Sequence, residues 1–394
     1  MNITYSREMI TVQSNILTHE SEREVMLKRI IDLAVKGLAN MFDEEKRLFC
    51  YRMRQTSDGI VREGISQRYT IISLLGLHRY EAQGGQSPID IQATLAVLLE
   101  DTEQIDNIGD LGLLLWLCAL VSPKQLNKIF HNLDIKRSLE KYSDGRQGKT
   151  TELAWFLAGL SHSALASNQK ANGQEDLSMQ AFSMLKRNFG AKGIFGHMNK
   201  SSLAGILRGR IGCFADQVYP IYALSMFAKA YENKEALKIA NECAEAICRL
   251  QGDLGQWWWH YDSLTGKVIG RCPVYSVHQD GMAPMALFAL SEVSGLNFDT
   301  HIYKGLKWIT GNNELGFDLI DTSQNVIWRS IYSKRYKMYY DEMLTLTGLT
   351  GNKRKHNDLR ILFECRPYQL GWLLYAFADK QMERAISKAE GLHA

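Results

Sequence analysis

Histidine and acidic side chains concentrate in one segment of this chain. It contains His260 and Asp262 and, further on, His278 and Asp280. Imidazole and carboxylate groups within one loop are the groups that general acid–base catalysis uses, so these four residues are predicted to be catalytic. Two plainer interpretations stay open beside that prediction. Asp280 lies where a helix is expected to begin and is equally well placed to cap it, and His278 is equally well placed as a structural histidine.

Polar residues recur before other apolar segments of the chain. Asp216 precedes the apolar stretch 221–230 much as Asp280 precedes 282–290, so it is a further catalytic candidate or a second helix cap. Arg68 and Arg366 have comparable places. Each is expected either to clamp a carboxylate or phosphate of a ligand, or to form an ion pair with Glu63 or Glu364 respectively. The residues of this kind that are predicted to bind substrate are Glu63, Arg68, Tyr69, Trp155, Tyr219, Arg366 and Tyr368.

Three consecutive tryptophans, Trp257, Trp258 and Trp259, precede the segment rich in histidine and acid. Aromatic faces stabilise cations and also stack on sugar rings. Since adjacent side chains point in different directions, one or two of the three are expected in the core and one at a cavity. With Tyr261 and Tyr275 of the same loop, they complete the predicted substrate-binding set.

Helices are expected to position these residues, because apolar residues recur at helical spacing along most of the chain. The pattern predicts about twelve helices, at 22–42, 66–80, 88–101, 110–121, 123–140, 151–167, 176–188, 215–231, 235–250, 279–294, 300–310 and 366–379.

The predicted helices alternate between two kinds. Odd members carry charge on one face and are typical of outer helices, whereas even members are apolar nearly all round and are typical of helices buried between neighbours. The long connections 43–65, 189–214, 251–278 and 311–365 all lead into even helices, so they are expected to gather on one rim. The sequence therefore predicts an all-α (α/α)6 toroid at 21–380, between an N-terminal extension at 1–20 and a C-terminal tail at 381–394.

One loop carries a motif that supports this architecture. Gln251-x3-Gly255-x-Trp257, preceded by a helix, is similar to the QW repeat of the terpenoid cyclase and protein prenyltransferase toroids. The resemblance implies an enzyme whose aromatic cavity holds an isoprenoid, with Asp280 or Asp216 as proton donor and tryptophans that shield carbocations. The usual acid (DxDD), diphosphate–magnesium (DDxxD) and zinc motifs of such enzymes have no match in this sequence.

Two other hypotheses stay open, since one fold serves many functions. The first is a carbohydrate-active toroid, either a uronic-acid epimerase, a lyase or a glycoside hydrolase, with rim carboxylates as acid and base. The second is a non-catalytic binding scaffold, whose rim residues would all cap helices or pair with each other. The expected partner is accordingly a small molecule or an oligosaccharide.

Composition narrows the range of partners. The chain of 394 residues has 46 basic and 43 acidic residues, so no strong field attracts nucleic acid. The longest apolar run, 111–121, is too short to span a membrane. Seven scattered cysteines and an N-terminus unlike a signal peptide favour the cytoplasm. Cys272 and His278 fall short of a metal site, and nucleotide motifs are missing, so neither metal nor cofactor is expected. Nothing in the sequence predicts the oligomeric state.

Overall fold

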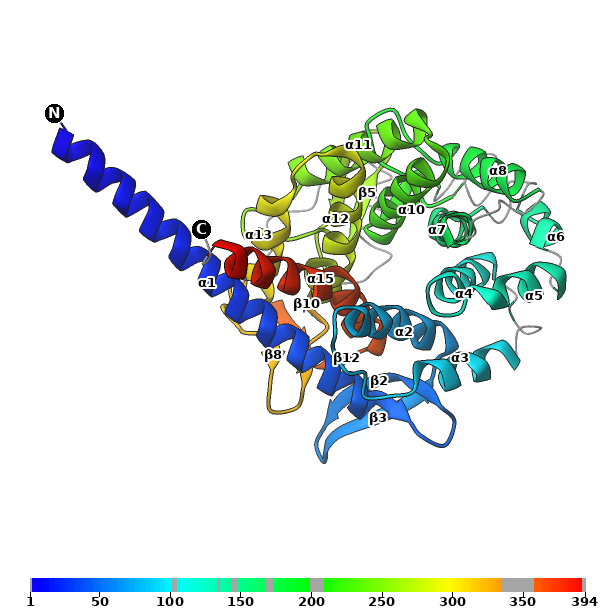
Figure 1. The fold of residues 1–394 in the computed structure, drawn as a ribbon, viewed down its shortest axis with the longest axis horizontal. Coiled ribbons are helices and arrows are strands. Elements are labelled where there is room, and N and C mark those ends of the chain that lie inside the picture. Colours follow the sequence, from blue (N-terminus) through cyan, green and yellow to red (C-terminus); the bar gives the residue numbers. More distant parts are fainter. Residues whose placement is uncertain are drawn as a thin grey trace.

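Six helices form a closed inner ring in the part of the chain that the structure describes (Figure 1). The structure is a computed structural model that describes residues 2–100, 105, 107–132, 135–142, 148–166, 173–198, 209–334 and 358–391, with side chains between residues 21 and 380. In ring order the inner helices are α2 (Gln67–Ala82), α4 (Ile108–Val121), α7 (Thr150–Ala166), α10 (Ala215–Tyr231), α12 (Ala283–Ser294) and α15 (Pro367–Gly391). Each packs against the next, and α15 packs against α2, which closes the ring.

A second set of helices lies outside this ring (Figure 1). It consists of α1 (Asn2–Met41), α3 (Ile91–Glu100), α5 (Lys124–Asn132), α6 (Ile135–Glu140), α8 (Gln174–Lys186), α11 (Lys234–Arg249) and α13 (Asp299–Ile309). Outer α8 packs on α7 and outer α11 on α10, whereas α1 packs on α15. The predicted (α/α)6 toroid is therefore confirmed.

Close packing of the inner ring depends on glycine at the crossing points. A Cβ atom on Gly159 of α7 would lie 2.1 Å from the carbonyl oxygen of Gly112 in α4, and one on Gly112 would lie 2.3 Å from Phe156 Cα. Gly76 of α2 and Gly371 of α15 meet in the same way. These two helix pairs are the most extensively packed in the ring, because the glycines at their crossing points have no side chain that would hold the backbones apart.

Several elements differ in extent from their predictions. In the region of the helix expected at 123–140 the described residues form α5 and α6, and residues 133–134 lie outside the described part of the chain. The helix expected at 279–294 begins with a π-helical turn, η2 (His278–Met282), before α12. At the termini α1 begins at Asn2 and α15 runs to Gly391, beyond the expected 22–42 and 366–379. The division into extension, toroid and tail stays a prediction.

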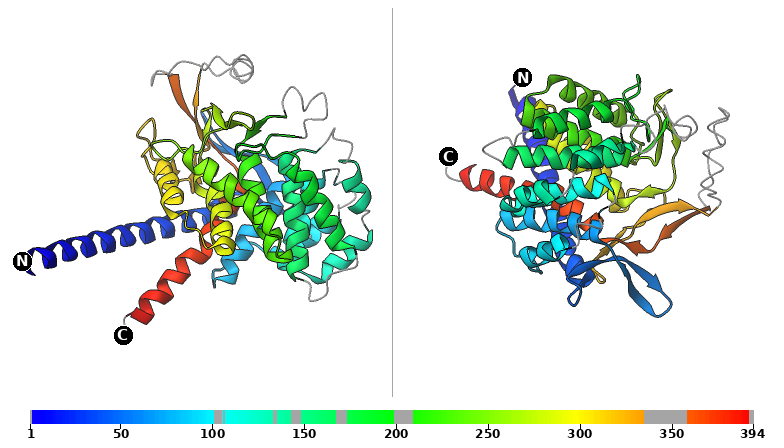
Figure 2. Two further views of the ribbon diagram at one scale, coloured as in Figure 1. Left: turned by 90° about the horizontal axis from the view of Figure 1, so that it is seen from above. Right: turned by 90° about the vertical axis from the view of Figure 1, so that its right-hand side faces the viewer.

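The long rim connections contain short strands, which the periodicity did not predict. The first and last connections share a sheet of β1 (Phe42–Asp43), β2 (Leu48–Thr56), β3 (Gly59–Ile65) and β12 (Glu364–Cys365). A second sheet contains β7 (Val274–Tyr275), β10 (Ser330–Ser333) and β11 (Leu359–Leu362), and a third contains β4 (Ile211–Cys213), β5 (His260–Asp262) and β6 (Lys267–Gly270). The strands β8 (Ile320–Asp321) and β9 (Val326–Ile327) pair separately. The sheets lie at one end of the helical ring (Figure 2), and they tie neighbouring connections together there.

Aromatic side chains close the interior of the ring. Trp116 of α4 is fully buried, and its ring centroid lies 4.6 Å from Tyr222 of α10, 4.9 Å from His162 of α7 and 5.5 Å from Trp372 of α15. Helices α4 and α10 are separated in the ring by α7, so their side chains meet only inside it. The centre of the toroid is therefore packed with protein and leaves the rim as the accessible surface.

Candidate active site

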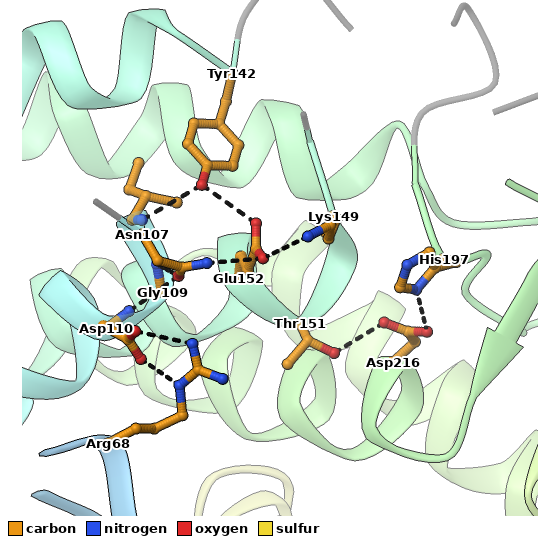
Figure 3. Close-up of polar contacts among 11 residues, drawn as sticks. Arg68, Asn107, Gly109, Asp110, Tyr142, Lys149, Thr151, Glu152, His197 and Asp216 are labelled. Carbon is orange, nitrogen blue, oxygen red and sulfur yellow. Dashed lines mark hydrogen bonds and ion pairs between the residues drawn. The ribbon is translucent and has the colours of Figure 1, made fainter. Parts of the chain in front are cut away.

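Three acidic residues lie in the first turns of three consecutive inner helices: Asp110 in α4, Glu152 in α7 and Asp216 in α10. The positive end of a helix dipole stabilises a carboxylate at this position. Figure 3 shows the three acids in a row along these neighbouring helices. We call these residues the carboxylate arc.

Asp110 forms a two-point ion pair with Arg68 of α2. The Arg68 Nη2 atom donates to Asp110 Oδ2 over 2.8 Å, and Nε donates to Oδ1. The side chains stay 40% and 24% exposed, and with Asn107 they line a cavity of about 190 Å³ between α2, α3 and α4. The expected pairing of Arg68 with Glu63 is wrong, because Glu63 pairs with two arginines of its neighbouring strand β2.

The other two carboxylates have protein donors around them. Glu152 accepts hydrogen bonds from Asn107 Nδ2 at 2.8 Å and from Lys149 Nζ at 3.0 Å (Figure 3). Asp216 is fully buried and accepts from Thr151 Oγ1 at 2.9 Å and pairs with His197 Nδ1 at 3.0 Å. Because Asp216 cannot reach solvent, its geometry suits a positioning residue for the partly exposed His197 imidazole.

Aromatic side chains lie between the helices under this rim. The Arg68 guanidinium lies 5.4 Å from the centroid of Trp155, which packs edge-on against Tyr219 at 4.9 Å. Trp372 Nε1 donates to the Tyr219 hydroxyl at 3.0 Å. Trp155 and Tyr219 are 8% and 4% exposed, so these predicted substrate-binding residues form a nearly closed floor under the rim.

On the opposite side of the ring, arginines and tyrosines surround Glu364. This carboxylate pairs with Arg366 and lies 3.5 Å from Arg329 Nε. Arg366 Nη1 donates to the Tyr69 hydroxyl at 2.9 Å, and Arg329 Nη1 donates to Tyr368 at 3.3 Å. The expected pairing of Arg366 with Glu364 is present. We call Arg329, Arg366, Tyr69, Tyr275 and Tyr368 the arginine–tyrosine cluster.

The three tryptophans have different surroundings. Trp257 is fully buried in the core, and Trp258 donates its indole N–H to the Leu250 carbonyl. Trp259 is partly exposed, stacks on His278 at 5.7 Å and contacts Tyr275 at 4.9 Å. Trp258 is also partly exposed, but Trp259 is the member that contacts Tyr275.

The motif residues around the tryptophans have structural contacts. Gln251 Nε2 donates to the carbonyl oxygens of Gly255 and His301, and Gly255 has a φ of +99°. A Cβ atom on Gly255 would lie 2.2 Å from the Lys304 carbonyl oxygen. Tyr261 is fully buried and accepts from the Trp258 backbone N–H, which removes it from the accessible rim. The loop thus anchors itself to α13.

Two of the predicted catalytic residues support the π-helical turn η2. Asp280 is fully buried, and its Oδ2 accepts from Gln369 Nε2 of α15 at 2.9 Å. Burial raises its pKa well above the ordinary aspartate value. His278 is 2% exposed, and burial lowers its pKa to about 3. A histidine that stays neutral and an aspartate that resists ionisation inside the fold suit a structural role better than substrate contact.

The predicted catalytic pair His260 and Asp262 lies in strand β5. Asp262 accepts from Leu264 N and Thr265 Oγ1 at 3.0 Å each, which fixes the turn after the strand. His260 is 5% exposed, with its ring centroid 5.1 Å from Trp259. Neither belongs to the carboxylate arc.

Four residues of the rim were not among the predicted site residues: Asp110, Glu152, His197 and Arg329. Asp110 had a signal, because it begins an apolar helix as Asp216 does. His197 and Arg329 lie in long connections without periodicity, so the sequence contained no signal for them. In the described part of the chain no three His, Cys, Asp or Glu side chains are grouped as a metal ion would require.

Solved structures with a similar fold include carbohydrate-active proteins. A possible GH105 family member from Salmonella enterica serovar Paratyphi A has a TM-score of 0.57 at 12% identity, over 91% of this chain and 94% of that chain. An unsaturated glucuronyl hydrolase specific for heparin has a TM-score of 0.54 at 14% identity, over 92% and 97%. A GH76 α-1,6-mannanase from a Salegentibacter species has a TM-score of 0.52 at 12% identity, over 90% and 99%.

At these identities the likeness establishes the fold, an α/α toroid of the kind found in these sugar-processing proteins. No family model matches the sequence, and no curated protein sequence matches it either. None of the described helices is both long and apolar enough to cross a membrane.

Proposed function

We propose that this protein is a carbohydrate-active enzyme that cleaves or rearranges an oligosaccharide at the rim of its toroid. The observation that carries the proposal is the carboxylate arc, three acids at the starts of consecutive inner helices beside a partly exposed histidine. Reactions at a glycosidic bond or a sugar ring carbon need a carboxylate or imidazole as acid and base. Asp110, the most exposed acid of the arc, is the proposed group in contact with substrate.

The isoprenoid hypothesis has less support. An isoprenoid chain needs a deep apolar cavity, yet in the described residues Trp116, Tyr222 and Trp372 pack against each other in the centre of the ring. The rim instead presents hydrogen-bonding groups and partly exposed aromatic faces, which suit sugar hydroxyls and sugar rings. The sugar-active proteins of similar fold favour the same choice.

A non-catalytic sugar-binding scaffold is the second candidate. One observation favours it: each carboxylate of the arc has protein partners, Arg68 for Asp110, Asn107 for Glu152 and His197 for Asp216. Acids that are satisfied by the protein itself have less capacity to transfer a proton to a ligand. Binding without turnover is the expected behaviour of such a scaffold.

A cytoplasmic location is also part of the proposal. All seven cysteines are free thiols, and five of them are buried. A chain with free thiols suits a reducing compartment. Its substrate there would be a short glycan or a precursor.

The test is turnover of defined oligosaccharides by the wild-type protein and by Asp110→Asn. Unsaturated glucuronyl disaccharides, uronate oligomers and α-1,6-linked mannose oligomers are incubated with each protein, and products are identified by mass spectrometry. We expect turnover of at least one sugar, with kcat reduced about 10²- to 10⁴-fold in Asp110→Asn, the usual contribution of general acid–base catalysis.

The matched control is Asp32→Asn, which removes an exposed ion pair with Lys28 on outer helix α1 and is expected to leave kcat unchanged. A prenyl diphosphate is included as a competing substrate class. Sugar binding without any turnover would favour the scaffold, and turnover of the prenyl diphosphate alone would reject the carbohydrate proposal.

A further inference from the structure

The arginine–tyrosine cluster and the strands beside it contain more positive than negative charge. Among the described residues, four guanidinium groups around β2, β10 and β12 share two carboxylates, those of Glu63 and Glu364. The guanidinium groups belong to Arg52, Arg54, Arg329 and Arg366. Each arginine approaches one of these carboxylates, but the four positive charges exceed the two negative charges by two. Partly buried charges of one sign repel each other, and an anion placed between them relieves that repulsion.

Arg329 is the least satisfied of these arginines. A guanidinium has five N–H donors, yet the contacts of Arg329 with described residues are a 3.5 Å approach to Glu364 and one hydrogen bond to Tyr368. Its side chain is 11% exposed, so it is held in place and still reaches the surface. It lies between two aromatic rings, 4.9 Å from the Tyr275 centroid and 5.9 Å from that of Tyr368.

Tyrosine hydroxyls add neutral donors beside the arginines. Burial raises the pKa of Tyr69 to about 12, so its phenol keeps its proton at neutral pH. Its oxygen accepts from Arg366 Nη1, which leaves the O–H to donate elsewhere. Tyr69 also stacks with Tyr51 at 5.4 Å and packs against Tyr368 at 4.6 Å. The cluster therefore combines fixed cations, protonated hydroxyls and partly exposed ring faces.

The two polar groups of the rim occupy different halves of the ring. The carboxylate arc begins α4, α7 and α10, whereas the cluster comes from α2, α15 and the connections that carry β7 and β10. Tyr219 contacts both Trp155 and Trp372, and these three side chains come from α7, α10 and α15. A ligand across this floor would meet acids at one end and cations at the other.

We infer that the arginine–tyrosine cluster is an anion subsite that takes the carboxylate or sulfate ester of an acidic sugar, with Arg329 as its main contact. The inference rests on the proposed function. It orients the substrate, because the anionic group is repelled by the carboxylate arc and attracted to the cluster. The bond that reacts then lies at the end next to Asp110.

The test measures binding, not turnover. Titration calorimetry compares a uronate disaccharide, its carboxyl-reduced analogue and a sulfated neutral disaccharide on wild-type protein, Arg329→Gln and Arg329→Lys. We expect Arg329→Gln to weaken the uronate about ten- to hundredfold, the usual effect of losing a charge-assisted hydrogen bond, and Arg329→Lys to weaken it less. The affinity for the carboxyl-reduced analogue should differ by no more than about twofold between wild type and the Arg329 variants. A parallel response of the sulfated sugar would extend the subsite to sulfate, and an unchanged one would restrict it to carboxylate.

The matched control is Arg54→Gln, which removes a partly exposed cation that pairs with Glu63 in the same sheet. If Arg54→Gln and Arg329→Gln weaken uronate binding equally, the effect comes from the total charge of the protein, and the subsite proposal is overturned. It is also overturned if Arg329→Gln weakens binding of the carboxyl-reduced analogue as much as binding of the uronate. Thermal unfolding identifies any variant that is misfolded, and Arg329→Lys then carries the comparison. Binding that depends on Arg329 but occurs without turnover would support the anion subsite and contradict the proposed enzymatic function. Turnover of neutral sugars that is independent of Arg329 would support the enzymatic function and contradict the subsite.

Discussion

Two aspartates with the same place in the sequence pattern differ in their physical state. Asp280 and Asp110 both lie in the first turn of an apolar inner segment. Asp110 is partly exposed and paired with Arg68, whereas Asp280 is fully buried and accepts a hydrogen bond from Gln369. A buried carboxylate without a cation is disfavoured when ionised, and this raises the pKa of Asp280. The surroundings of an aspartate, and not its place in the sequence pattern, therefore determine its chemical state.

Because the pKa of Asp280 is raised, the contribution of this residue to the stability of the fold is predicted to fall as pH rises. In the unfolded chain this carboxyl ionises near pH 4, but in the folded protein it holds its proton to a higher pH. Stability from Asp280 is complete below the unfolded pKa and is lost as pH rises toward the folded pKa. We expect Asp280→Asn, which cannot ionise, to unfold at a higher temperature than wild type at pH 8 and at a similar one at pH 3.5. Calorimetry at the two pH values measures this, and an equal shift at both would contradict it.

Helix packing at the element scale depends on small residues. Helices α4 and α7 approach so closely at Gly112 and Gly159 that backbone atoms fill the place of a Cβ. An apolar surface all round drives such helices together, but their separation is set by the residue at the crossing point.

Gly159→Ala is expected to destabilise the protein by about 1–3 kcal/mol or more, since overpacking displaces the helix backbone. Urea unfolding measures the free energy difference. Gly148→Ala is the control, because its Cβ would meet neighbours at 3.7 Å, an ordinary contact distance. If both substitutions cost the same, the close approach of α4 and α7 is not what determines stability.

The whole protein is expected to lose folding stability at acidic pH, because neutral histidines are buried in the ring. His162 stacks on Trp116 and hydrogen-bonds to Tyr222 at 2.8 Å, and burial lowers its pKa to about 3. Above pH 6.5 both folded and unfolded chains leave it neutral. As pH falls from 6.5 toward 3, the unfolded chain binds a proton that the folded protein refuses, so stability decreases.

His162→Gln tests this linkage. One proton corresponds to about 1.4 kcal/mol per pH unit, so the slope of unfolding free energy against pH between 6 and 4 should fall by about that amount relative to wild type. Urea unfolding at several pH values gives the slope. An unchanged slope would mean that His162 is already protonated in the folded protein.

Much of the toroid followed from the sequence alone. Inner helices are apolar on every face and outer helices on one, and that local pattern predicted the order, the character and the approximate bounds of the helices. It also predicted that long connections gather on one rim. The strands in those connections escaped prediction because each is short and pairs with a distant segment, as β12 does with β2.

The site depended on the tertiary structure. The sequence marked Asp216, Arg68 and Arg366 as rim residues, but their partners come from distant parts of the chain. Spacing could not show that Arg68 meets Asp110, or that Arg329 approaches Glu364. Helical periodicity is a local property that the sequence itself records. Burial and pairing of a charge depend on which connections fold over it, and only the closed ring determines that.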